Sequence, residues 1–162
     1  MRIIYLMGKK GTGKTITLKL LYFIFCKNGA SNNMQVDFFR NDIEPDRVYK
    51  SIEKLTYLKL ANRRESVQNI AVKFTFNKKT FLIYTCGDTT KLIKKGIKLA
   101  QKYQVDFYIA PTHKAFISYI LEECSFDNVV FIEKNISSKK ENFFNCNLSQ
   151  ANELFLQVQH ES

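Results

Sequence analysis

The chain is poor in several residue types whose abundance would define a class of protein. Its 162 residues include no Trp, two Pro and six Gly, which excludes collagen-like repeats and Pro/Gly-rich disorder. Hydrophobic residues make up 45% and charged residues 25%, an ordinary balance for a globular protein. A chain of this length buries about two thirds of its unfolded surface, so we expect one domain. That domain should span residues 1–162.

Cysteine, histidine and long apolar runs are also scarce. The chain has two His and no Cys-x-x-Cys spacing, which argues against a structural zinc site and a disulfide scaffold. We therefore predict free thiols and a reducing, cytoplasmic location. The apolar stretches at 3–7 and 20–26 fall far short of the roughly 20 residues of a membrane span, so neither a span nor a signal peptide is expected. The cysteines are Cys26, Cys86, Cys124 and Cys146.

Acidic residues are the scarcer of the two charged types. Lys+Arg is 25 and Asp+Glu is 15, a formal net charge of +10, and no carboxylate precedes Asp37. Such a surplus favours polyanionic partners: nucleotides, nucleic acid or an acidic membrane surface. A solvated, lysine-rich surface explains it equally well. The lysines between Lys91 and Lys102 lack interleaved aromatics, so a solvated helix face is the favoured interpretation there.

Apolar periodicity predicts strands that alternate with helices. This alternation predicts an α/β fold, a three-layer α/β/α sandwich with a mostly parallel sheet and one antiparallel hairpin strand around residues 68–76. A last helix is expected after a Ser149 cap, behind a polar loop or lid at 134–147. Strands are predicted at 2–7, 34–40, 70–76, 80–86, 105–110 and 129–133, and the other helices at 15–27, 45–60, 89–104 and 112–123.

The first loop of this pattern matches G-x-x-x-x-G-K-[ST], with an apolar strand before it and a helix after it. Glycines let successive backbone N–H groups point at phosphate oxygens without a Cβ clash, and the helix N-terminus adds positive charge. The lysine reaches the β- and γ-phosphates, and the hydroxyl of the last residue is placed to bind Mg²⁺. The motif consists of Gly8, Lys9, Lys10, Gly11, Thr12, Gly13, Lys14 and Thr15.

In these residues the chain resembles the P-loop NTPase superfamily. The resemblance covers eight residues of motif, and its strand–loop–helix context extends it to about residue 27. We predict nucleoside triphosphate hydrolysis with Lys14 as a catalytic residue. The resemblance itself implies a P-loop NTPase fold and binding of ATP or GTP with Mg²⁺. It does not identify the reaction, because one fold supports many functions.

Members of this superfamily usually carry a second, acidic metal residue at the end of an apolar strand. Here the strand at 81–86 has Tyr84 where that aspartate is often found, and Asp88 follows just beyond. Asp88 is therefore the candidate for holding a Mg²⁺-bound water or orienting the nucleophilic one. A turn residue that caps the next helix is an equal alternative. Asp37 and Asp42 compete for the metal role at lower weight.

Three branches of the superfamily offer more detailed resemblances. In the deviant P-loop group of partition and positioning ATPases, an extra lysine lies five residues before the main one, where this chain has Lys9. That lysine reaches the partner's nucleotide, so the resemblance implies a homodimer. Lys10 in place of a loop glycine and Tyr84 in place of the strand aspartate are departures. Two solvated lysines at a loop tip are the competing explanation.

The other two branches are small-molecule or nucleotide kinases and small GTPase-like switches. A kinase needs groups that bind its phosphate acceptor. It also needs a lid over the phosphates, and residues 134–140 are the candidate for that lid. The hairpin at 68–86 is similar to the strand pair of small GTPases. The guanine-reading Asn-Lys-x-Asp is absent, with residues 112–115 the nearest stretch, so we expect ATP rather than GTP. The candidate acceptor-binding residues are Arg40, Asp42, Arg63 and Arg64.

A different class of function also stays open. Because the strand aspartate is replaced, the chain is alternatively a nucleotide-binding sensor or switch subunit that hydrolyses slowly or not at all. Such a subunit would act in a larger assembly with a protein or nucleic-acid partner. His113 follows a strand end, where ligand sites of α/β proteins cluster, so it is a candidate phosphate contact. An exposed residue in the first turn of a helix is the simpler interpretation.

Overall fold

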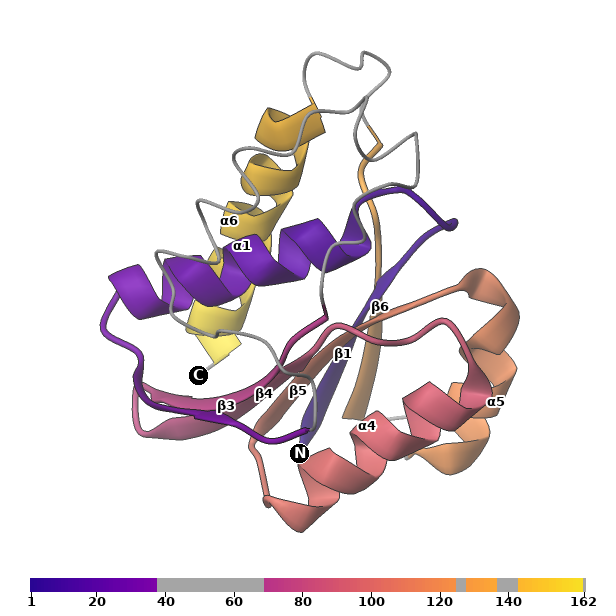
Figure 1. Cartoon of the computed structure of the whole chain (residues 1–162), viewed down its shortest axis with the longest axis horizontal. Helices are drawn as coiled ribbons and strands as arrows, with labels where there is room; N and C mark the ends of the chain where they lie inside the picture. The colour runs from indigo at the N-terminus through magenta and orange to yellow at the C-terminus, as the bar shows by residue number, and fades with distance from the viewer. Residues whose placement is uncertain (38–68, 125–127, 137–142, 162) are drawn as a thin grey trace.

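The computed structural model describes residues 1–37, 69–124, 128–136 and 143–161 (Figure 1). Its core is one six-stranded sheet in the order β2-β3-β4-β5-β1-β6. The strands are β1 (Arg2–Met7), β2 (Ser31–Gln35), β3 (Ala71–Phe76), β4 (Lys79–Tyr84), β5 (Phe107–Thr112) and β6 (Val129–Glu133). The helices of the described residues are α1 (Lys14–Lys27), α4 (Thr90–Lys102), α5 (Ile117–Glu123), α6 (Phe143–Glu161) and the short 3-10 helix η1 (Lys114–Phe116).

The sheet is mostly parallel, as its sequence pattern predicts. β1 pairs in parallel with β5 on one side and with β6 on the other, and β4 pairs in parallel with β5. β3 runs antiparallel to both β2 and β4, so it is the predicted antiparallel strand of the hairpin. The carboxyl ends of β1, β4, β5 and β6 therefore meet at one edge of the sheet, where ligand sites of α/β proteins form.

Helices cover both faces of the sheet, an arrangement compatible with a three-layer sandwich (Figure 1). α1 and α6 pack over one face, where the core is rich in phenylalanine. α4 and α5 pack over the opposite face, which buries Tyr5, Tyr84 and Tyr108. Side chains alternate between the faces of a strand, so neighbouring residues of β4 and β5 supply the two cores. The phenylalanines of the first core are Phe25, Phe74, Phe76, Phe81, Phe107 and Phe155.

α1 has the start, the burial and the end that its sequence predicts. It begins after Gly13, whose backbone is left-handed at φ 88°, and most of its residues are buried. It ends at Asn28, whose side-chain amide donates to the Ile24 carbonyl at 2.8 Å, and at Gly29 with φ 95°. Glycine and asparagine tolerate the left-handed turn that closes a helix, which explains this ending.

Three predicted boundaries are wrong. The second strand lies at Ser31–Gln35 instead of 34–40, and residues 38–40 lie outside the described part. β5 continues through Pro111 and Thr112 instead of ending at Ala110. Thr112 caps no helix, because it is the last residue of β5 and α5 begins only at Ile117. Pro111 pairs with Leu6 of β1, whereas the pairing of β5 with β4 ends at Ile109, so one side of the strand has no neighbour at the proline.

The C-terminal helix is also longer than predicted. α6 begins at Phe143 instead of at a Ser149 cap, and Ser149 lies inside it, with its hydroxyl donating to Glu153 at 3.3 Å. The predicted loop at 134–147 is therefore helical from residue 143 onward, and residues 137–142 lie outside the described part. The inward residues of the helix are as predicted: Ala151, Leu154, Phe155 and Val158 are buried.

Two predicted absences can be compared with the structure. None of the four cysteines forms a disulfide. Among the described helices, none combines the length and the apolar character needed to cross a membrane. The predicted helix at 45–60 lies outside the described residues.

Candidate phosphate-binding site

The glycine-rich loop lies at the carboxyl edge of the sheet, between β1 and α1 (Figure 1). The strands on both sides of β1 hold its end in place. The Gly8 N–H donates to the Thr112 carbonyl at 3.2 Å, and the Lys134 N–H donates to the Met7 carbonyl at 2.7 Å. Residues from β5 and from the segment after β6 therefore flank the loop.

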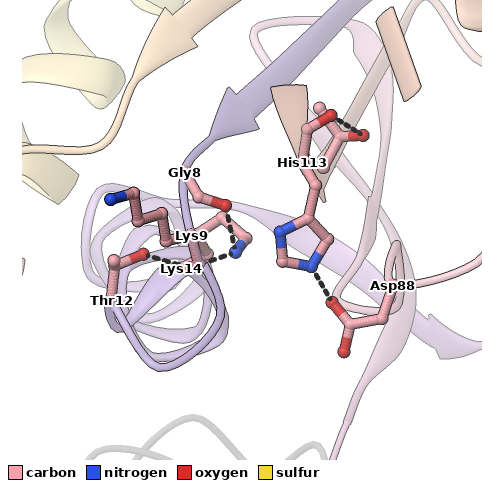
Figure 2. Close-up of polar contacts among 7 residues, drawn as sticks. Gly8, Lys9, Thr12, Lys14, Asp88 and His113 are labelled. Atoms are coloured by element: carbon pink, nitrogen blue, oxygen red, sulfur yellow. Dashed lines mark hydrogen bonds and ion pairs between the residues drawn. The ribbon is translucent and has the colours of Figure 1, made fainter. Parts of the chain in front are cut away.

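Two glycines give the loop its shape. Gly11 and Gly13 have φ of 79° and 88°, in the left-handed region that side chains disfavour. A Cβ on Gly13 would lie 2.5 Å from Asn147 Oδ1, whereas one on Gly11 would meet nothing within 4 Å. Inside the loop, the Thr12 hydroxyl donates to the Lys9 carbonyl at 2.9 Å (Figure 2). Gly13 is thus required by both backbone and packing, and Gly11 by backbone alone.

Lys14 folds back over its own loop. Its ammonium group donates to the carbonyls of Gly8 at 2.8 Å and Lys9 at 2.9 Å (Figure 2), and the residue is 6% exposed. Burial lowers the pKa of the Lys14 ammonium, and the nearby Asp88 carboxylate partly opposes this shift. A buried cation held by two neutral carbonyls gains from an anion that replaces them, because charge-assisted hydrogen bonds are the stronger kind.

Thr15 lies in the first turn of α1, half-buried beside Lys14. The N–H groups of this turn have no carbonyl one turn before them, and the helix dipole adds positive charge at the same point. The first turn of α1 contains no acidic residue that would neutralise it. This helix end can therefore accept the oxygens of an anionic group, with the Thr15 hydroxyl beside them.

Asp88 contacts His113, whose ring lies on the side of the loop where Lys14 is found (Figure 2). His113 Nε2 is 3.0 Å from Asp88 Oδ1, and the imidazole lies between the Lys14 ammonium and the Asp88 carboxylate (Figure 2). The Asp88 side chain is 65% exposed, against 21% for His113. Gly87 makes this approach possible, since a Cβ there would lie 1.8 Å from the Pro111 carbonyl oxygen.

The strand order explains why a histidine stands between the lysine and the carboxylate. β5 separates β1 from β4, so the end of β4 is about 10 Å from that of β1 at the usual strand spacing. His113, directly after β5, fills the intervening position. The sequence marks His113 as a strand-end residue, but its pairing with Asp88 depends on the strand order.

Asp37, the acidic candidate besides Asp88 that the structure describes, is placed less favourably. The side chain of Asp37 is 3% exposed and accepts a hydrogen bond from the Lys95 ammonium at 2.6 Å. The Asp37 carboxylate therefore forms an ion pair with α4. Asp42, like Arg40, Arg63 and Arg64, lies outside the described residues. Within the described residues, no group of three or more His, Cys, Asp or Glu side chains is placed to hold a metal ion.

α6 contributes polar contacts beside the loop that the sequence analysis misses. Asn147, 1% exposed, accepts from the Thr17 hydroxyl at 2.8 Å and lies against Gly13. Gln150, one turn later, donates to the Glu133 carbonyl at 2.7 Å and accepts from the Asn135 N–H at 3.1 Å. Two polar residues at i and i+3 on an apolar helix face are the signal that could have revealed this role. Together they connect α1 to the end of β6.

Lys134 is a second buried lysine beside the loop. It is 6% exposed, its ammonium donates to the Asn135 carbonyl at 2.5 Å, and burial lowers its pKa. A Cβ on Gly8 would lie 3.0 Å from the Cβ of Lys134, so the two backbones approach closely. In the sequence, Lys134 is marked only as the first residue of the lid predicted at 134–140, of which residues 137–140 lie outside the described part.

Lys9 and Lys10 occupy the exposed tip of the loop. Figure 2 shows the Lys9 side chain directed away from His113 and Asp88. Lys9 contributes its backbone carbonyl to Lys14, and its own ammonium group does not join the cluster around His113.

Comparison with known proteins adds no relative to this picture. The chain matches no protein-family model, and no curated protein or solved structure is significantly similar to it. The chain's own residues therefore carry the functional assignment proposed below.

Proposed function

We propose that the chain is a P-loop nucleotide-binding protein that binds ATP with Mg²⁺ and hydrolyses it. One observation carries the proposal. The buried Lys14 ammonium is bonded to two carbonyls of a glycine loop, at the N-terminus of a helix without acidic residues in its first turn. Loop, lysine and helix end converge on one anionic ligand, and the G-x-x-x-x-G-K-[ST] spacing makes that ligand a triphosphate.

Each side chain has a defined task in this proposal. Lys14 exchanges the Gly8 and Lys9 carbonyls for oxygens of the β- and γ-phosphates, and the first-turn N–H groups of α1 bind the others. The Thr15 hydroxyl fits a Mg²⁺ ion, because this cation prefers oxygen ligands and shares them with substrate phosphates. When bound, Mg²⁺ would neutralise charge that develops on the phosphates.

His113 and Asp88 supply the base of the proposed site. The exposed Asp88 carboxylate orients the imidazole at 3.0 Å, and the ring faces the side of the loop where Lys14 lies. A carboxylate that orients a histidine is a common arrangement for accepting a proton from water. We propose that the pair positions and deprotonates the attacking water.

A second candidate function is a switch or sensor that binds nucleotide and hydrolyses it slowly. The favouring observation is that β4 ends at the buried Tyr84 and is followed by the buried Thr85, both neutral. The first carboxylate after the strand is that of the exposed Asp88. The kinase alternative has its acceptor residues outside the described part and stays a prediction, as does the homodimer implied by Lys9.

Isothermal titration calorimetry with ATP, GTP and ADP, with and without MgCl₂, tests the proposal. We expect ATP to bind with Mg²⁺, and Lys14→Ala to weaken binding at least tenfold, which is about 1.4 kcal/mol. Lys27→Ala is the matched control, because Lys27 is an exposed lysine at the far end of the same helix. Unchanged ATP affinity in Lys14→Ala would overturn the proposal. Phosphate release by the wild-type chain then separates an NTPase from a sensor.

A further inference from the structure

The outward face of α4 carries a stripe of lysines. Lys91, Lys95, Lys98 and Lys102 follow one another at intervals of four, three and four residues, so they lie on successive turns, and all are exposed. The stripe extends about 16 Å at 1.5 Å per residue. The apolar residues of α4 are buried on the opposite side, and the helix contains no Asp or Glu.

Few carboxylates neutralise this helix. Lys94, beside the stripe, pairs with Glu123 at 3.1 Å, and Lys95 pairs with Asp37 at 2.6 Å. Lys91, Lys98 and Lys102 form no ion pair with any residue that the structure describes. A row of like charges that the described carboxylates compensate only in part costs free energy through repulsion, which an external anion relieves.

An aromatic residue extends the charge from the helix onto the sheet. The ammonium of Lys102 lies 5.5 Å from the centroid of the Tyr103 ring, and that of Lys73, on β3, lies 5.7 Å from the same centroid. Cation–π contacts of this length hold both ammonium groups in place. Two lysines from different elements thus place their ammonium groups beside the same ring. The sequence alone does not reveal this arrangement, since Lys73 is thirty residues from Tyr103.

We propose that this surface binds the phosphodiester backbone of a nucleic acid. We name it the α4 lysine face and define it by Lys73, Lys91, Lys95, Lys98, Lys102 and Tyr103. Its length of about 16 Å covers about five nucleotides at 3.4 Å per nucleotide. Contacts to phosphate carry affinity without reading sequence, and lysine on a regular face is suited to such contacts.

The composition of the face distinguishes this partner from an anionic membrane. Helices that bind membrane surfaces insert apolar residues between their cations. On α4 the apolar side chains Ile93, Ile97 and Ala100 are buried in the core, and the outward positions of the stripe are lysines. Apart from the half-buried Tyr103, the face therefore presents lysines and no apolar side chain that would anchor it in a lipid surface.

The α4 lysine face is also linked to the candidate phosphate site. α4 begins at Thr90, and the Thr89 hydroxyl caps it by accepting from the Leu92 N–H at 3.3 Å. Asp88 is the residue before that cap. The proposal nevertheless stands independently of nucleotide binding, because the face lies along the helix and needs no ligand at the loop.

Fluorescence anisotropy with labelled single-stranded DNA, RNA and duplex DNA, in the absence of nucleotide, tests the proposal. With three to four contacts, we expect log K to fall against log salt with a slope of about −2 to −3 for single strands. Lys98→Ala and Lys102→Ala should each reduce the steepness of that slope by about 0.7. Lys27→Ala, an exposed lysine on α1, is the matched control and should leave the slope unchanged.

Two results would overturn the proposal. One is nucleic-acid binding that is absent, or that Lys27→Ala weakens as much as Lys98→Ala does. The other is equal binding to phosphatidylserine vesicles with the same loss in Lys98→Ala and Lys102→Ala, which would assign the face to a membrane. Lys14→Ala keeps the two proposals separable: it should lose ATP and retain nucleic acid.

Discussion

Lysines at the phosphate loop and lysines on α4 have the same side chain in opposite environments. Lys14 and Lys134 are each 6% exposed, and their ammonium groups donate to backbone carbonyls. Burial lowers the pKa of both. Lys98 and Lys102 on α4 are exposed. The buried pair have lost most of their hydration, whereas the α4 lysines have kept theirs.

This difference sets what each group can do. A buried cation binds a ligand at one defined point, where low dielectric strengthens the interaction and salt screens it weakly. Exposed cations act as a row, through counterion release, and lose affinity steeply as salt rises. The net charge of +10 therefore includes two kinds of lysine, those buried at one discrete site and those exposed in a row on the surface. Experiments can separate the two.

The largest effect should come from destroying the loop that buries Lys14. Gly13→Ala puts a Cβ 2.5 Å from Asn147 Oδ1 on a backbone with φ 88°. We expect the free energy of unfolding to fall by about 3 kcal/mol, the sum of backbone strain and overpacking, and ATP binding to be lost. Urea unfolding measures the first and calorimetry the second.

Gly11→Ala is the control for that variant. It shares the left-handed backbone, at φ 79°, but its Cβ meets nothing within 4 Å. We expect a loss of about 1 kcal/mol from strain alone. Equal losses in both variants would mean that the contact between α6 and the loop contributes nothing.

Lys19, in the middle of α1, tests what burial alone does to a lysine. It is 5% exposed, and desolvation lowers its pKa from 10.5 to about 8. Its charged form therefore destabilises the folded state below about pH 8, and the penalty disappears as the pH rises from about 8 to 10.5. Lys19→Met should raise the free energy of unfolding at pH 7 by on the order of 2–3 kcal/mol.

The pH dependence provides the check on Lys19. Wild-type stability should rise between about pH 8 and 10.5 relative to Lys19→Met, since the unfolded chain binds more protons in that window. Parallel stability curves for the two chains would contradict the prediction. Lys27→Met, at an exposed lysine near the end of the same helix, should show no such difference.

Asp88→Asn removes the negative charge that acts on Lys14. Asp88 is the charge that opposes the lowered pKa of Lys14, and it orients His113 at 3.0 Å. We expect ATP turnover to fall by at least tenfold, with ATP affinity changed little, because the pair acts on water. Steady-state phosphate release measures this effect.

A double-mutant cycle with His113→Ala then tests whether the two residues act as one unit. If they do, the double variant should be no slower than either single variant. Additive losses would assign separate roles to the two residues.

The smallest effect should be that of salt concentration on the affinity of the loop for ATP. Between about 50 and 200 mM salt, nucleic-acid affinity should fall by more than tenfold, while ATP affinity at fixed free Mg²⁺ should change by about threefold or less. A steep salt dependence of ATP binding would show that the phosphate site is as exposed as the α4 lysine face.

Local features of the fold could be predicted from the sequence with good accuracy. The strand at residues 2–7, the glycine loop and the helix after it all follow from short-range rules, because apolar runs, glycine and helix caps act within a few residues. The antiparallel hairpin and the inward residues of the last helix were also predictable. The errors at Pro111 and Ser149 arose where pairing and packing override a local signal.

The surroundings of the loop depended on contacts between distant residues. Placement of β5 between β1 and β4 brings His113 between Lys14 and Asp88. Asn147 meets Thr17 across 130 residues of chain, and although its place on an apolar helix face marks Asn147, no local pattern identifies Thr17 as its partner.

The residues that we propose to bind phosphate therefore occupy eight consecutive positions, since backbone conformation and helix polarity are properties of neighbours in the chain. Which side chains complete the site, and which lysines lose their water, follows from strand order and helix packing. Those depend on burial summed over the whole domain, where any one residue contributes little. The motif is the basis of the proposed ligand class, and the fold brings the surrounding side chains to the loop.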